Sequence, residues 1–211
     1  SAVPGQVEGV SEEGSDDVIR VFLIGGASLV GKSTFSRGLA ARLGAEVVAT
    51  DDLGRHPGRP WPAPRAHVAE FYRRLSPEAI DAFLLDHHGN LWPRIEALVL
   101  GRLEAGLPLV VEGAAVRPEL SARVLADPRV RGVWLTASDA AISDRIARLS
   151  GRAHATPELA ELVDVFTART LRDAARLRES VDRHGLHAVD AGDDEARARL
   201  LDAFVGARRA G

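Results

Sequence analysis

The octapeptide Gly26-Ala27-Ser28-Leu29-Val30-Gly31-Lys32-Ser33 fits the pattern G-x-x-x-x-G-K-[ST] of a phosphate-binding loop, called the P-loop below. Lys32 is the only lysine in the chain, and arginine supplies every other basic side chain. A lysine carries a compact ammonium on a flexible stem, which reaches between phosphates where a planar guanidinium fits poorly. The single lysine therefore favours a phosphate site.

The residues around the P-loop predict a strand before it and a helix after it. Residues 18–24 are a β-branched apolar run, as expected of a parallel strand buried on both faces. Residues 32–43 predict a helix that ends at Gly44. Backbone N–H groups and the helix N-terminus are expected to bind a nucleotide triphosphate. The expected nucleotide-binding residues in this segment are Gly26, Ala27, Ser28, Val30, Gly31, Lys32, Ser33 and Thr34.

Strand and helix patterns alternate through the rest of the chain. Further strands are predicted at 46–50, 107–112, 130–135 and 186–189. Helices are predicted at about 65–75, 77–87, 91–105, 118–126, 138–149, 157–183 and 193–207, with Pro77 and Pro93 near two helix starts. This alternation predicts an α/β fold, in which helices cover both faces of a five-stranded parallel sheet. We expect one domain over 18–211, preceded by a disordered acidic tail over 1–17.

Carboxylates follow two of the predicted strands. Asp51 and Asp52 end the second strand, and Glu112, followed by Gly113, ends the third. Ligands of open α/β sheets bind beyond the carboxyl ends of the strands. One carboxylate could accept the proton of a substrate hydroxyl, and another could hold Mg²⁺ directly or through water. For the aspartates, capping of the following turn is the alternative.

Three motifs together resemble the P-loop small-molecule kinases: the octapeptide, Thr50-Asp51-Asp52-Leu53 and Leu109-Val110-Val111-Glu112-Gly113. They are similar to nucleoside and nicotinamide-riboside kinases and to 2-phosphoglycerate-kinase-like proteins. The resemblance implies a three-layer sandwich of strand order 2-3-1-4-5 with a small helical lid. It also implies Asp51 as the base or hydroxyl-orienting residue, an acid at the position of Glu112, and an adenine site bordered by the turn at Gly192. The candidate Mg²⁺ ligands are Ser33, Glu112 and Asp52.

Arginines near the expected lid are candidates for phosphate contacts. Arg145, Arg148 and Arg152 end one predicted helix, and Arg169 and Arg172 lie on the next. Such side chains can neutralise the charge of a transferring phosphoryl group. We expect Arg145 to bind the nucleotide and Arg148 to act in catalysis with Lys32 and Asp51. A solvated helix face is the alternative.

Residues 53–92 are expected to form the acceptor pocket. This stretch holds Trp61, Tyr72, Trp92 and four of the seven histidines. Residues 53–75 contain five arginines against Glu70 alone, which is typical of either an anionic acceptor or a solvated surface. The pair His87-His88 lacks the partner spacing of a metal site.

Composition excludes several other classes. The chain has no cysteine and therefore no disulfide or cysteine metal site. Without the five acids of the tail, the net charge of −3 becomes +2, which gives no reason to expect nucleic-acid or membrane binding. A guanine-nucleotide switch would need a second lysine for its N-K-x-D motif. We expect a cytoplasmic monomer or homodimer that uses ATP and Mg²⁺ to phosphorylate a hydroxyl of a small molecule. A regulatory nucleotide-binding protein without an acceptor stays open.

Overall fold

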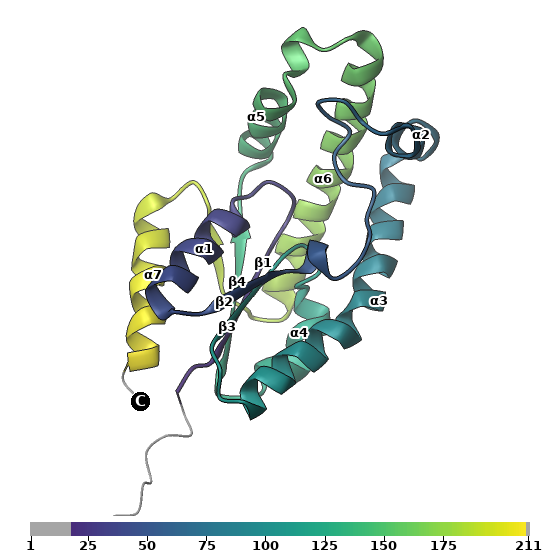
Figure 1. The fold of residues 1–211 in the computed structure, drawn as a ribbon. Coiled ribbons are helices and arrows are strands. Elements are labelled where there is room, and N and C mark those ends of the chain that lie inside the picture. The colour runs from purple at the N-terminus through teal and green to yellow at the C-terminus, as the bar shows by residue number, and fades with distance from the viewer. Residues whose placement is uncertain (1–17, 210–211) are drawn as a thin grey trace, which may run out of the picture.

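A five-stranded parallel sheet forms the centre of the protein, in a computed structural model that describes residues 18–209. The expected acidic tail, residues 1–17, lies outside the described residues. The strands are β1 (Val21–Gly26), β2 (Glu46–Ala49), β3 (Leu109–Glu112), β4 (Val130–Thr136) and β5 (Ala188–Asp190). Their order is β2-β3-β1-β4-β5, and each neighbouring pair is parallel (Figure 1). The predicted fold and the central position of the P-loop strand are confirmed.

Helices cover both faces of this sheet (Figure 1). They are α1 (Lys32–Leu43), α2 (Ala66–Arg74), α3 (Pro77–Glu104), α4 (Pro118–Leu125), α5 (Asp139–Ser150), α6 (Pro157–Arg183) and α7 (Asp194–Arg209). Two short 3₁₀ helices, η1 (Thr50–Asp52) and η2 (Arg152–His154), follow β2 and α5. Gly44 ends α1 in the left-handed conformation, as its position predicts. None of the helices described within residues 18–209 is long and apolar enough to cross a membrane.

The prediction that Pro93 lies near a helix start is wrong. The two helices expected at 77–87 and 91–105 form the single helix α3, and Pro93 lies inside it. His88, Trp92, Ile95 and Val99 are all buried and follow one another at spacings of three and four residues. This stripe runs past the proline without a break, so burial against the sheet outweighs the cost of a proline in a helix interior, about 3 kcal/mol.

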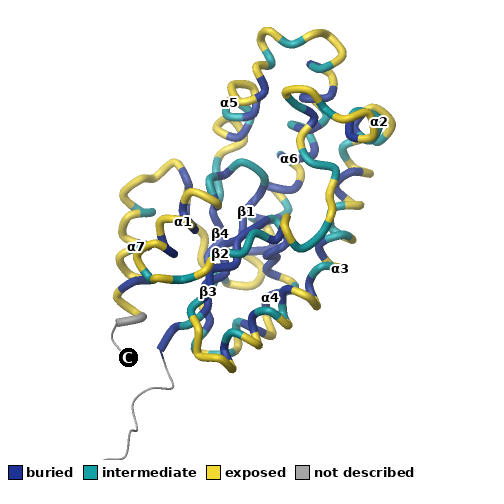
Figure 2. Tube along the Cα trace, in the orientation of Figure 1, coloured by how far each residue is buried: buried dark blue, intermediate teal, exposed yellow. Residues whose placement is uncertain are grey.

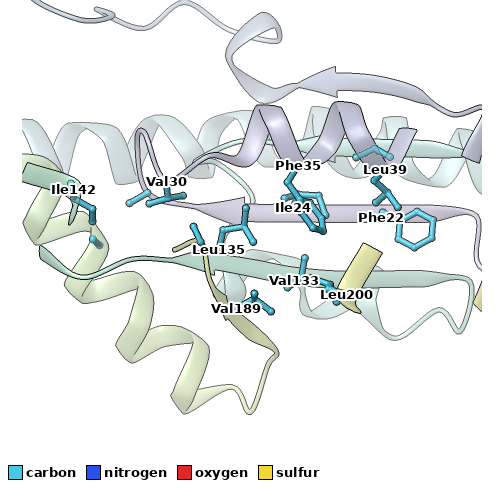
Figure 3. Packing of buried hydrophobic residues seen from close by; sticks show 14 of the residues in the cluster. Phe22, Ile24, Val30, Phe35, Leu39, Val133, Leu135, Ile142, Val189 and Leu200 are labelled. Atoms are coloured by element: carbon cyan, nitrogen blue, oxygen red, sulfur yellow. The ribbon is translucent and has the colours of Figure 1, made fainter. Parts of the chain in front are cut away.

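The side chains of β1 alternate between two apolar layers. Phe22 and Ile24 point toward α1, where they pack with Phe35 and Leu39 (Figure 3). Val21 and Leu23 belong to the opposite layer, which the buried stripe of α3 completes. Both faces of the central strand are therefore shielded from solvent, which explains its uninterrupted apolar sequence. Figure 2 shows the buried strands enclosed by helices with exposed outer faces.

Three helical segments rise beyond the carboxyl ends of the strands: α2, α5 and the first half of α6 (Figure 1). The loop between η1 and α2 is fastened to α6 and α2. Trp61 meets Phe166 edge to face, with ring centroids 4.7 Å apart. The Tyr72 hydroxyl donates to the Gly58 carbonyl over 2.8 Å. These contacts hold the loop above the sheet edge, where it helps to enclose a cavity.

Candidate active site

A cavity of about 360 Å³ opens at the carboxyl ends of the strands. Its floor is the P-loop together with the ends of β2 and β3, and its walls come from the loop before α2 and from α2, α3, α5 and α6. The cavity therefore joins the predicted phosphate site to the region 53–92 that was expected to hold an acceptor.

The P-loop has a backbone that needs glycine at two positions. Gly26 and Gly31 have φ values of 148° and 102°, which side-chain-bearing residues rarely adopt. A Cβ at Gly26 would also lie 2.7 Å from the Leu135 carbonyl oxygen. Leu29 has a φ of 66°, the only positive value of a non-glycine residue between 18 and 209. Such strained positions concentrate at ligand sites.

Lys32 projects into the base of the cavity. Its side chain is 9% exposed, and Nζ donates to the Ala27 carbonyl over 2.7 Å. Burial lowers the pKa of Lys32 from its ordinary value, while the charges of Glu112 and Asp51 oppose this shift. An ammonium has three donors, so Lys32 has donors beyond the one that Ala27 uses.

Ser33 and Glu112 meet directly beside the lysine. The Ser33 hydroxyl donates to Glu112 Oε1 over 2.7 Å. The next residue, Gly113, packs so closely against Thr50 that a Cβ there would lie 1.8 Å from Thr50 Oγ1. Glycine at 113 thus lets the ends of β2 and β3 approach each other, which brings Asp51 to the same cavity as Glu112.

Asp51 lies on η1 and forms an ion pair with His56. Asp51 Oδ2 is 3.3 Å from His56 Nε2, and the aspartate side chain remains 66% exposed. The hydrogen bond from His56 lowers the pKa of Asp51, and the same bond raises the pKa of His56. Asp51 is therefore ionised at neutral pH. Asp52 is exposed and is not among the residues that line the cavity.

Two arginines from the lid region reach the P-loop. Arg145 Nη1 donates to the Leu29 carbonyl over 2.8 Å, and Arg169 Nη1 donates to Ser28 Oγ over 3.2 Å. Arg169 is 7% exposed, its guanidinium lies 4.1 Å from the Phe166 ring centroid, and its Nε is buried without a hydrogen-bond partner in the described chain. Both arginines line the cavity.

The other candidate arginines lie elsewhere. Arg148 is exposed and does not line the cavity. Arg152 forms two hydrogen bonds with Asp164, and Arg172 forms an ion pair with Glu78. The sequence offered one signal that favours Arg169 over Arg148. Arg169 follows Phe166 by three residues, on the stripe of α6 that is buried, so its side chain points toward the protein interior.

The part of the cavity away from the P-loop is lined by aromatic rings, histidines and one buried acid, and is called the acceptor side below because the sequence predicts an acceptor there. Its lining residues include His56, Arg59, Tyr72, His87, His88, Leu91, Phe166 and Asp173. Of the five arginines within 53–75, only Arg59 lines the cavity, and Arg73 and Arg74 form ion pairs with Glu70. Trp92 packs in the core, and the Gly192 N–H bonds Asp190 in the turn after β5, outside the cavity lining.

The sequence reasoning missed Asp173 and its partner Arg117. Asp173 is 5% exposed, and its Oδ1 accepts a hydrogen bond of 2.6 Å from Arg117 Nη1. Arg117 is 1% exposed and also bonds Glu119, which in turn accepts from Ser180. Arg117 lies before α4 and Asp173 lies on α6, so nothing in the local pattern connects them.

Comparisons with known proteins agree with this architecture. Residues 21–172 match the protein family AAA_33, described as an AAA domain. A sugar kinase from Janibacter sp. HTCC2649 superposes with a TM-score of 0.54 at 15% identity, covering 89% of this chain and 93% of the other. A tRNA isopentenylpyrophosphate transferase from Bacillus halodurans superposes with a TM-score of 0.53 at 16% identity, covering 90% and 97%.

A gluconokinase from Sinorhizobium meliloti 1021 gives a TM-score of 0.48 at 18% identity, covering 90% of this chain and 92% of the other. A search of curated proteins found no match. At these identities the sugar kinase and the tRNA isopentenylpyrophosphate transferase, with TM-scores above 0.5, establish a shared fold and leave the substrate open. The family match covers more than half of the sequence, and the chain therefore belongs to this AAA domain family, with the fold of the P-loop kinases.

Proposed function

We propose that this protein is an ATP-dependent phosphotransferase that moves the γ-phosphate to a hydroxyl group of a small molecule. One observation carries the proposal: Lys32 and Ser33 of the P-loop share a single cavity with the ionised carboxylate of Asp51. The same cavity extends past this carboxylate to further polar side chains, among them His88 and Asp173, which supports room for an acceptor beside the phosphate site.

The phosphates would be held by backbone and side-chain donors that converge on the P-loop. The proposed nucleotide-binding residues are Gly26, Ala27, Ser28, Val30, Gly31, Lys32, Ser33, Thr34 and Arg145, and Arg169 joins them by its contact with Ser28. Gly192 as the border of the adenine stays a prediction, as does Arg148 as a catalytic residue. Arg148 would have to approach from an exposed position on α5.

The residues beside Lys32 fit a magnesium ion. Ser33 Oγ and Glu112 Oε1 are hard oxygen donors that already meet at 2.7 Å. The residues between 18 and 209 contain no cluster of three or more His, Asp or Glu side chains suited to a metal, so this ion would depend on phosphate and water for its other ligands. Bound Mg²⁺ would neutralise charge on the β- and γ-phosphates. Asp52 as a further ligand stays a prediction, because it does not line the cavity.

In the proposed reaction the acceptor oxygen forms a bond to the γ-phosphorus while the bond to the bridging oxygen of ADP breaks. The hydroxyl proton passes to the Asp51 carboxylate. Because its pKa is lowered, Asp51 is a weak base, and its main contribution is to orient the hydroxyl. His56 holds the carboxylate in place from 3.3 Å. Lys32, Arg145 and Arg169 supply positive charge to the transferring group.

The test is ADP release from ATP and Mg²⁺ in the presence of sugars, cyclitols, amino alcohols and nucleosides. Stimulation by one class, together with a phosphorylated product and loss of activity in Lys32→Ala, supports the proposal. ATP turnover that no hydroxylated compound stimulates would favour the regulatory alternative. Undiminished ATP affinity in Lys32→Ala would remove the lysine from the site.

A further inference from the structure

We propose that the face of the cavity between α3 and α6 is a subsite for a compact, uncharged, polyhydroxylated acceptor such as a sugar or cyclitol, whose hydroxyls bind His88 and Asp173. This inference rests on the proposed function and names the class of its acceptor. It assigns a role to two buried polar side chains that neither nucleotide binding nor phosphoryl transfer uses.

His88 supplies the first polar group of the subsite. It is 7% exposed and lines the cavity, and its Nδ1 is buried without a hydrogen-bond partner in the described part of the chain. Burial lowers the pKa of His88 to about 4, so the ring is neutral at pH 7. Leaving a buried lone pair without a hydrogen-bond partner costs less free energy than leaving a buried N–H without one. In the neutral ring, Nδ1 therefore carries the lone pair and Nε2 carries the proton. His88 can therefore donate one hydrogen bond to a ligand.

Asp173 supplies the second group. Its carboxylate lines the same cavity, while the buried guanidinium of Arg117 holds Oδ1 at 2.6 Å and compensates its charge. A carboxylate fixed in this way accepts hydrogen bonds without demanding a cationic ligand. A hydroxyl both donates and accepts, so a donor at His88 and an acceptor at Asp173 suit neighbouring hydroxyls.

The charges around the cavity argue against an anionic acceptor. Lys32, Arg145 and Arg169 lie at the P-loop, where the nucleotide phosphates would occupy them. On the acceptor side each carboxylate has its own partner: His56, whose pKa the hydrogen bond with Asp51 raises, lies against Asp51, and the guanidinium of Arg117 lies against Asp173. Arg59 is the remaining cation of that lining; it is exposed and lies 6.0 Å from the Trp61 ring centroid.

The remaining walls and the size of the cavity fit a small ring. Leu84 and Leu91 line the cavity with partly exposed apolar surface that the C–H face of a sugar or cyclitol can cover, while the rings of Tyr72 and Phe166 are almost fully buried in the same lining. The cavity of about 360 Å³ must hold the transferring phosphate as well as the acceptor. That volume favours a single ring over a dinucleotide or an oligomeric substrate.

The first experiment compares three acceptor panels: neutral hexoses and cyclitols, their monophosphates, and nucleosides. We expect neutral polyols to stimulate ADP release at least tenfold and to yield a phosphorylated product. Stimulation by the monophosphates or nucleosides alone would overturn this inference and leave the kinase proposal standing. If no panel stimulates ADP release, this inference fails, and the kinase proposal fails with it when amino alcohols give no stimulation either.

The second experiment uses three variants of His88 with the best neutral acceptor. His88→Leu removes the donor, His88→Asn places an amide near the Nδ1 position, and His88→Gln places one near the Nε2 position. Loss of one neutral hydrogen bond corresponds to roughly a 3- to 10-fold rise in the acceptor KM. We expect this rise in His88→Leu and His88→Asn and an acceptor KM close to the wild-type value in His88→Gln. The KM for ATP should be unchanged in all three variants.

A merely structural role of His88 gives a different pattern. With such a role, the KM values for ATP and for the acceptor would change together, or the acceptor KM would rise in proportion to the loss of melting temperature among the three variants. Either result overturns the inference, and so does an acceptor KM in His88→Gln that equals the value in His88→Asn. The comparison of Gln with Asn remains decisive if the leucine variant fails to fold, because both amides have similar polarity.

Discussion

Asp51→Asn removes one negative charge from the cavity and keeps the shape of the side chain. The Asp51–His56 pair spans 3.3 Å, but the two side chains are 66% and 33% exposed. Exposed pairs of this kind contribute less than about 1 kcal/mol, so the variant should fold and melt close to the wild type. Turnover should fall on the order of 10²-fold, which corresponds to about 2.7 kcal/mol of lost transition-state stabilisation.

The assay is coupled ADP release with an identified acceptor at saturating ATP, with Asp52→Asn as the matched control. Asp52 lies beside Asp51 on η1 and is exposed as well, but it is outside the cavity lining, so its replacement should leave turnover unchanged. The KM for ATP should change little in either variant, because Glu112 is the stronger charge acting on Lys32. Full turnover in Asp51→Asn would refute hydroxyl activation, and loss in Asp52→Asn alone would transfer the role to Asp52.

Arg169→Ala should raise the KM for ATP about tenfold, because it removes a buried cation beside the P-loop. Arg148→Ala, at an exposed position, should leave the KM for ATP unchanged. A larger KM increase in Arg148→Ala than in Arg169→Ala, measured by steady-state kinetics, would restore Arg148 as the phosphate contact. Because the folded pKa of His88, about 4, lies below its ordinary 6.5, the unfolded chain binds the proton first as the pH falls. Between pH 7 and 5 the wild type should therefore lose about 2 kcal/mol more unfolding free energy than His88→Gln, and equal losses in urea titrations would contradict this. Arg117→Met should cost about 3–5 kcal/mol by leaving Asp173 buried and unpaired, and adding Asp173→Leu should recover much of it. Strictly additive effects in urea unfolding would show that the two side chains are not coupled.

The fold was predictable from local patterns. The apolar run of β1, the P-loop and the helix that ends at Gly44 each have a short-range physical cause, and the alternation of elements implied the parallel sheet. Strand order came from the resemblance to P-loop kinases and is confirmed. The prediction failed at Pro93, because the burial of Trp92 and Ile95 on one continuous face is a tertiary effect that outweighs local proline chemistry.

The candidate site was predictable where it follows strand ends. Ser33 and Glu112 were expected near each other and are hydrogen-bonded. The acceptor side was not predictable, because Asp173 lies on α6 and Arg117 lies 56 residues earlier, just before α4. Charged residues in helical sequence are usually solvated, and only the packing of α4 and α6 reveals that this pair is buried.

Helix α6 places Arg169 and Asp173 one turn apart. Arg169 touches the P-loop through Ser28, and Asp173 faces the acceptor side, so both ends of the reaction rest on one rigid segment of backbone. Under the proposed function, a nucleotide in contact with Arg169 and an acceptor in contact with Asp173 would both bear on this one helix. Where nucleotide and acceptor bind as proposed, and binding of one shifts α6, affinity at the other subsite changes by a factor that is equal in both directions. The spacing of four residues, about one turn of a helix with 3.6 residues per turn, is what places both side chains on the same face of α6.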